Sequence, residues 1–305
     1  MTYAEVAIGL ILVGLSAYLL FGGADFGAGL WHLIVSRDVR SRNVIEHAMG
    51  PLWEANHVWL IFVMVMTWTA FPPVFADVMT AYWVPLSLAA LGIVVRGSAF
   101  VFVKTEQRAW YRWAFGTGSL LTPFALGAVA GTIATGGTRW LSLPGVYAGL
   151  LTVGLCAYLA AVYLTWDARR LAASDTGTAE RFRRYALATG VLVGVPALPG
   201  AIALGVRSPL IALSALAGLV SLALLWRRAY LAVRQTAGPA AVAVLWGAAD
   251  LSHLDLAAAA AHDAVLRVVF VALGVGGFFL LPSLAWLYVL FQREAGSHED
   301  RARAG

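Results

Sequence analysis

The feature that most constrains this chain is a series of apolar stretches, each long enough to cross a lipid bilayer as a helix. About twenty apolar residues are needed for one crossing, and nine stretches among the 305 residues meet that requirement. They are 4–35, 51–72, 78–103, 111–136, 142–166, 185–205, 208–226, 229–250 and 266–291. The chain is 61% hydrophobic and 12% charged, whereas soluble domains are about a quarter charged. We therefore predict an all-α integral membrane protein with about nine transmembrane helices.

The distribution of basic residues predicts how these helices are oriented, because cytoplasmic loops of membrane proteins are enriched in Lys and Arg. One set of alternate loops holds seventeen of the 21 basic residues: Arg37, Arg40, Arg42, Lys104, Arg108, Arg112, Arg169, Arg170, Arg181, Arg183, Arg184, Arg227, Arg228, Arg234, Arg293, Arg301 and Arg303. The opposite set holds Arg139, Arg207 and Arg267. We expect the N-terminus outside and the C-terminus in the cytoplasm of a cell (inner) membrane, and no nucleic-acid partner. The opening segment lacks the basic start and cleavage site of a signal peptide, so we expect it to remain as a helix.

Three ionisable residues fall inside the apolar stretches, where a charge costs about 2.5–3.5 kcal/mol on insertion scales. Asp25 lies in GGADFGAG (22–29), Glu54 in GPLWEANHVWLI (50–61) and Arg96 in VVRGSAFVF (94–102). The predicted topology places all three in the inner leaflet. In one hydrated pocket Arg96 would keep one carboxylate ionised, while burial would favour the protonated form of the other. Such a site could take up protons from the cytoplasm.

A structural interpretation of the same residues stays open. Arg96 could simply neutralise Asp25 or Glu54 so that three helices can pack. Asn56 and His57 lie beside Glu54, with His57 one helical turn along. They could extend a proton path, or they could form hydrogen bonds between helices.

Four further residues of these motifs point to packing. Gly23 and Gly27 have the small-xxx-small spacing that lets membrane helices approach closely. Trp53 and Trp59 flank the acidic position of the second motif and are expected to pack between helices.

Histidine and cysteine are too sparse to predict a metal or haem site in this chain alone. Two facing histidines usually hold a b-type haem, and the candidates are His32, His47 and His57. After them, no histidine precedes His253, and the single cysteine is Cys156. No phosphate-binding loop or nucleophile motif is present. We predict no catalytic residue, metal or cofactor bound by this chain alone.

The motifs resemble subunit II of the cytochrome bd-type quinol oxidases. The resemblance rests on GGADFGAG, on GPLWEANHVWLIFVMVMTWTAFPPVF (50–75), on LGIVVRGSAFVFVK (91–104) and on LLPSLAWLYVLFQR (280–293). It implies two four-helix bundles and one peripheral helix. The first bundle would occupy residues 1–140, and 141–305 would hold the second bundle, the final helix and a short tail.

The resemblance also implies a function. In that family a subunit I carries the haems, haem b with haem d as an option, and oxidises quinol while reducing O2 to water. Protons come from the cytoplasm along a path involving subunit II, and its acidic position corresponds to Glu54, with Asp25 and Arg96 as companions. Whether this chain binds a quinone or lipid is left open. Two alternatives remain: an ion-coupled secondary transporter, and a purely structural membrane partner.

The chain departs from the family pattern at several places. Glu54 stands where Asp is frequent, and Lys104 where many members have Arg. An aromatic–proline stretch commonly precedes the last helix, but this chain has WGAADLSHLDLAAAAAHDAVLR (246–267).

Overall fold

The computed structural model describes residues 2–106, 108–171, 176–203, 208–248 and 255–303, and the regular structure in these ranges is helical. Side chains are described throughout them except at 49–55, 103–106, 171, 176, 198, 201–203, 232, 234, 248, 281, 284–285 and 287–303. The elements are α1 (Tyr3–Ala17), the π-helical turn η1 (Tyr18–Gly22), α2 (Gly23–Ile34), α3 (Val39–Ala70), α4 (Pro72–Ala81), α5 (Trp83–Glu106), α6 (Ala109–Ala134), α7 (Leu143–Leu171), α8 (Thr176–Ala203), α9 (Pro209–Trp226), α10 (Tyr230–Ala248), α11 (Leu256–Ala259) and α12 (Asp263–Arg303).

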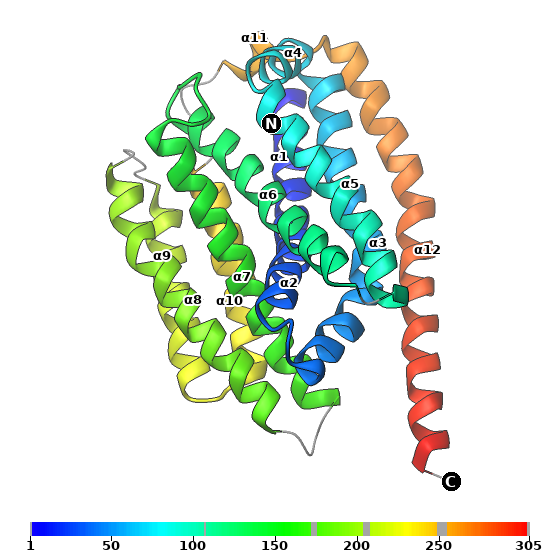
Figure 1. Ribbon diagram of the computed structural model, residues 1–305. Coiled ribbons are helices and arrows are strands. Elements are labelled where there is room, and N and C mark those ends of the chain that lie inside the picture. Colours follow the sequence, from blue (N-terminus) through cyan, green and yellow to red (C-terminus); the bar gives the residue numbers. More distant parts are fainter. Residues whose placement is uncertain (1, 107, 172–175, 204–207, 249–254, 304–305) are drawn as a thin grey trace.

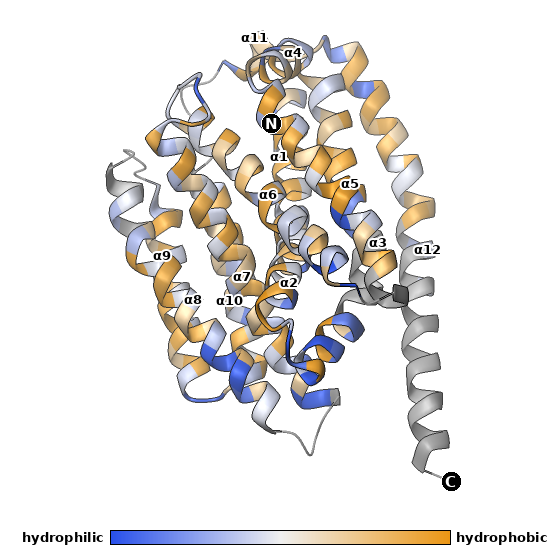
Figure 2. Cartoon of the chain, in the orientation of Figure 1, coloured by the Kyte–Doolittle hydropathy of each residue, from blue (hydrophilic) through white to orange (hydrophobic). Residues whose placement is uncertain are grey.

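Several of these helices are long and apolar enough to cross a membrane. Within the described ranges there are six, or seven if α3 and the bent-over α4 are counted as one span. The six are Tyr3–Ile34, Trp83–Phe102, Ala109–Ala134, Leu143–Arg170, Pro209–Trp226 and Asp263–Leu280. Figure 2 shows their apolar residues along the height of the bundle, with hydrophilic residues gathered mainly near its ends. The prediction of an all-helical, multi-pass membrane protein is confirmed, while the number nine stays a prediction.

The long helices run roughly side by side, with α7 in a central position (Figure 1). α7 packs against α2 and α6 on one side and against α8 and α10 on the other. α9 packs mainly against α10 and also touches α8. α12 stands at the edge of the bundle and contacts α1 and α3. α1 begins and α12 ends at opposite ends of the molecule (Figure 1).

The corner after α3 differs from the sequence prediction. The backbone of Phe71 is not helical (φ −136°, ψ 61°), and Pro72 then starts a new helix, a position that suits its fixed φ. α4 is therefore bent by 120° from α3. The third apolar helix begins at Trp83, whereas the hydropathy predicted a start at residue 78, because hydropathy does not register a change in backbone direction.

Ion pairs hold three connections together at the basic end of the bundle. The Arg181 guanidinium contacts the Asp38 carboxylate, which links the start of α8 to the N-cap of α3. Arg228, after α9, lies 3.7 Å from Glu180. A hydrogen bond from Ser41, together with the Arg181 charge, holds the pKa of Asp38 below its usual value, and burial opposes this shift only in part. The connections α2–α3, α7–α8 and α9–α10 therefore share one end, as the distribution of basic residues predicts.

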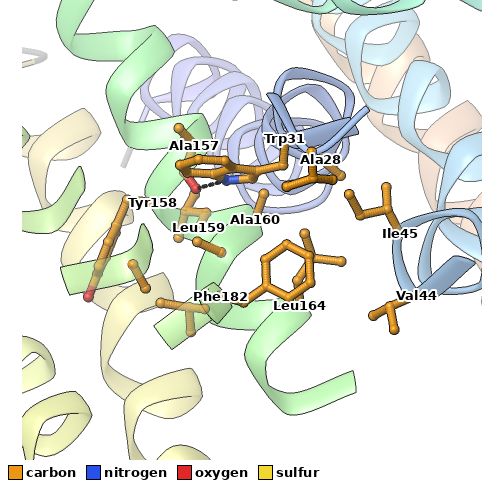
Figure 3. Close-up of a cluster of buried hydrophobic side chains, with 14 of the residues drawn as sticks. Ala28, Trp31, Val44, Ile45, Ala157, Tyr158, Leu159, Ala160, Leu164 and Phe182 are labelled. Atoms are coloured by element: carbon orange, nitrogen blue, oxygen red, sulfur yellow. Dashed lines mark hydrogen bonds between the residues drawn. The ribbon is translucent and has the colours of Figure 1, made fainter. Parts of the chain in front are cut away.

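The largest apolar cluster lies where α2, α7 and α8 meet. The Trp31 indole on α2 donates a 2.8 Å hydrogen bond to the Ala157 carbonyl on α7, and Figure 3 shows this bond among the surrounding side chains. The Trp31 ring also stacks on Tyr185 of α8, with 4.5 Å between ring centroids. Val44 and Ile45 extend the cluster onto α3. This core fixes the position of α2, which carries Asp25 six residues before Trp31, or about 1.7 turns.

Candidate functional site

The centre of the first six helices contains a fully buried ion pair. Nη2 of Arg96, on α5, lies 2.5 Å from Oδ1 of Asp25, on α2. The two side chains are 1% and 0% exposed. The Arg96 guanidinium also donates to the Asp25 backbone carbonyl at 3.2 Å. Two opposite charges predicted at a similar depth are thus in direct contact.

α6 completes the environment of the guanidinium. Nε of Arg96 donates to the Ser119 hydroxyl at 2.8 Å, and that hydroxyl donates to the Phe115 carbonyl at 2.7 Å. The charge also faces two aromatic rings, with 5.0 Å to the Phe26 centroid and 5.1 Å to that of Phe115. Cation–π contact adds stabilisation that grows when the charge is shielded from water.

The backbone just before Asp25 is unusual. The first long helix is continuous from Tyr3 to Ile34, but Tyr18–Gly22 forms a π-helical turn. Single π-turns inserted in α-helices occur frequently at functional sites. The turn resets the register of α2 relative to α1, and so it determines which face of the helix presents Asp25.

Glycines bring the neighbouring helices close to this pair. A Cβ on Gly27 would overlap the Cys156 backbone carbonyl of α7, whereas one on Gly23 would make ordinary contacts of 3.5 Å with Leu159 and 3.6 Å with Cys156. A Cβ on Gly29 would overlap the Ser119 hydroxyl. α2 therefore packs directly on α7 at Gly27 and on α6 at Gly29.

Several buried polar atoms around the pair have no hydrogen-bond partner among the described residues. They are Oδ2 of Asp25, Nη1 of Arg96, the Tyr18 hydroxyl, Nδ1 of His57 and both side-chain amide atoms of Asn56. The charges of Asp25 and Arg96 also act electrostatically on Tyr18 and on His57. Buried polar groups are normally hydrogen-bonded, so these unpartnered atoms are an exception that sets the surroundings of the pair apart.

The other sequence-predicted residues are located as follows. Asn56 is buried and His57 is half-buried, both on α3. Trp59 is partly buried against a cluster that contains Tyr18 and Phe26. The side chains of Glu54 and Trp53 lie outside the described residues, although their positions fall on the continuous helix α3.

Sequence reasoning missed Ser119, Phe115 and Tyr18, and it considered His32 only as a haem ligand. Nε2 of His32 lies 3.2 Å from Oε1 of Glu46 on α3. A weak signal for Ser119 was available, because it ends the small-residue run GTGS (116–119) in an apolar helix. Among the described residues, no group of three or more His, Cys, Asp or Glu is arranged to hold a metal ion.

Comparison with known proteins gives a consistent set of matches. Residues 3–291 match the family model described as cytochrome bd terminal oxidase subunit II. The chain is 30% identical over 135 residues to the cytochrome bd ubiquinol oxidase subunit 2 of Bacillus subtilis (strain 168), covering 43% of this chain and 39% of that protein. It is 25% identical over 177 residues to the cytochrome bd-I ubiquinol oxidase subunit 2 of Escherichia coli (strain K12), covering 52% and 46%. The chain thus matches less than half the length of either relative.

Proposed function

This chain belongs to the cytochrome bd terminal oxidase subunit II family, and from that membership we propose that it is the haem-free second subunit of a bd-type quinol:oxygen oxidoreductase. The family match confirms the resemblance predicted from the sequence motifs. In the proposed complex a subunit I carries haem b, with haem d as an option, and performs quinol oxidation and O2 reduction. This chain stabilises subunit I in the membrane and supplies no catalytic residue of its own.

The proposed membrane arrangement has nine crossings in two four-helix bundles, with α12 at the periphery. The packing of α8 and α10 along α7 supports counting both as crossings. The gathering of basic connections at one end supports an orientation with that end in the cytoplasm. The N-terminus would then be outside.

We further propose that the Asp25–Arg96 pair, together with Glu54, conducts cytoplasmic protons to the oxygen-reduction site in subunit I. The observation that carries this proposal is the complete burial of the pair beside unpartnered polar atoms. A buried charge costs several kcal/mol after relaxation, and helix packing alone does not require it. The Glu54 position lies on α3 one turn before His57, and the charges of the pair act electrostatically on His57.

The replacement Glu54→Gln tests this role in the purified complex with subunit I. It removes the exchangeable proton but keeps the size of the side chain. Quinol-driven O2 consumption should fall by about 100-fold or more, with the haem spectrum and assembly unchanged. The matched control is Asp77→Asn, an exposed acid on α4, which should keep wild-type turnover. Wild-type turnover in assembled Glu54→Gln would refute the proton role.

The direct contact between Arg96 and Asp25 favours one other candidate, a purely structural role. In that case the double replacement Asp25→Asn/Arg96→Gln would keep the turnover of the assembled complex. Under the proton-conducting role, the double variant assembles but loses turnover.

A further inference from the structure

A second ionisable pair shares helix α2 with the Asp25–Arg96 pair and joins it to α3. Nε2 of His32, on α2, is 3.2 Å from Oε1 of Glu46, on α3. His32 is 1% exposed, whereas the Glu46 side chain is 30% exposed. The pair therefore has one member in the interior and one that water can reach.

Helix geometry aligns this pair with the Asp25–Arg96 site. His32 follows Asp25 by seven residues on α2, which is about 10 Å along the helix and nearly the same face. On α3, His57 follows Glu46 by eleven residues, about 16 Å, again on nearly the same face. Glu54 occupies an intermediate level on α3. The two pairs thus lie at successive levels along α2, the first facing α5 and the second facing α3.

Residues of α6 connect the two levels. The edge of the His32 ring meets Phe115 at 5.5 Å, and the same Phe115 ring faces the Arg96 guanidinium at 5.1 Å. Ser119, one turn further along α6, packs against Gly29, which lies between Asp25 and His32 on α2. The Ser119 hydroxyl already accepts a hydrogen bond from Arg96. A hydroxyl is therefore located between the two pairs.

The two ring nitrogens of His32 have different surroundings, and this difference gives a direction for proton transfer. Nδ1 of His32 is buried and has no hydrogen-bond partner among the described residues, while Nε2 is occupied by Glu46. An imidazole with one nitrogen on an acid near water and the other facing the interior can move a proton through its ring. Most buried side-chain polar atoms have a hydrogen-bond partner, so the unpartnered Nδ1 of His32 is an exception.

We propose that Glu46 and His32 form the entrance of the proton path, with Ser119 on the route to Asp25 and Arg96. This inference rests on the proposed function. Glu46 takes a proton from the aqueous phase and passes it to Nε2 of His32. The imidazolium releases its Nδ1 proton inward, and the ring returns to its first tautomer before the next proton arrives. Glu54 or water molecules span the remaining distance, since direct transfer needs groups within about 3 Å.

The test uses the complete two-subunit oxidase with Glu46→Gln and Glu46→Asp. Glu46→Gln should slow O2 consumption and proton uptake at least about 10-fold, while reduction of the haems by quinol in the absence of O2 keeps its wild-type rate. Glu46→Asp should restore most of the activity. Asp38→Asn is the matched control. Asp38 is an acid at the start of the same helix, α3, but it contacts Arg181 and not His32. Asn can still act as the N-cap of the helix. This variant should keep wild-type turnover.

Chemical rescue separates transfer from packing. In Glu46→Ala, added acetate or formate should restore turnover, and in His32→Gly added imidazole should do so, because each supplies the missing proton carrier. If His32→Gly does not assemble, the Glu46 variants decide the matter alone. Turnover of Glu46→Gln equal to that of Asp38→Asn, with Glu54→Gln impaired, would overturn the entrance and leave the proposed function intact. If Glu54→Gln is also unimpaired, the proton role itself fails.

Discussion

The two halves of the bundle bury different kinds of polar groups. Residues 3–134 (α1–α6) bury the charges of Asp25 and Arg96 together with His32. The buried polar side chains described in 143–248 (α7–α10) are hydroxyls: Thr165, Thr178, Ser214 and Ser221.

This difference has a physical meaning. A hydroxyl can donate its hydrogen bond to a nearby backbone carbonyl. Thr165 donates to the Ala161 carbonyl at 2.6 Å, and Ser214 donates to the Ala240 carbonyl at 2.8 Å. A buried charge needs a partner charge and further hydrogen bonds. Hydroxyls can therefore be buried between helices at little cost, whereas a buried charge is costly unless it is paired. The first half thus holds the buried charges on which the proposed function depends, and α7 of the second half packs against α2.

The largest effect expected from this comparison is the loss of one buried charge. Arg96→Met leaves the Asp25 carboxylate unpaired, which should lower the free energy of unfolding by about 3–5 kcal/mol. The double replacement Asp25→Asn/Arg96→Met should recover part of that loss. In the second half, Tyr158→Phe removes the 2.5 Å bond to Ser221 and should cost only about 1 kcal/mol. Denaturant unfolding of the detergent-solubilised complex measures all three, and equal losses for Arg96→Met and Tyr158→Phe would contradict the contrast between the halves.

An intermediate effect is expected where the halves meet. Gly27→Ala places a methyl group against the backbone carbonyl of Cys156. The backbone of α7 cannot move aside to relieve this overlap as easily as a flexible side chain could. The free energy of unfolding should fall by about 1–3 kcal/mol. Gly23→Ala, one turn away, makes only ordinary contacts and should change it by less than about 0.5 kcal/mol. A comparison of thermal unfolding midpoints tests this, and similar midpoints for the two variants would show that the halves do not depend on close approach at Gly27.

The smallest expected effect is the pH dependence of the stability that Asp38 contributes at the basic end of the bundle. The pKa of Asp38 is lowered in the folded state, so its contacts with Ser41 and Arg181 stabilise the fold above the unfolded pKa of about 4. This contribution is lost as the pH falls through the lower folded value. Because the ion pair is solvent-exposed, the loss should stay below about 1 kcal/mol.

Thermal unfolding of wild type and Asp38→Asn between pH 6 and 3 measures this contribution. Hydrogen bonding to Arg183 similarly lowers the pKa of Glu180, so wild type should lose stability in acid even without Asp38. The two midpoints should nevertheless converge as the pH falls. A gap that widens in acid would contradict the assigned sign.

The candidate site was partly predictable from the sequence. Hydropathy and the bias of basic residues placed Asp25 and Arg96 at a common depth, because an intramembrane charge stands out in an apolar stretch. Which acid contacts Arg96 could not be predicted, since two carboxylates were available at that depth. Ser119 was missed because a serine in a helix usually bonds its own backbone, and nothing in the local pattern shows that it faces Arg96.

The sequence by itself determined the helical membrane class, the family and the approximate positions of the long helices, because the bilayer imposes length and polarity on each segment independently. Only the tertiary structure decided that Arg96 contacts Asp25, that Ser119 lies between the two ionisable pairs and that His32 meets Glu46. Those contacts depend on helix rotation, on the π-helical turn before Gly23 and on the close approach at Gly27 and Gly29. They arise from packing between different helices, which local sequence patterns do not encode.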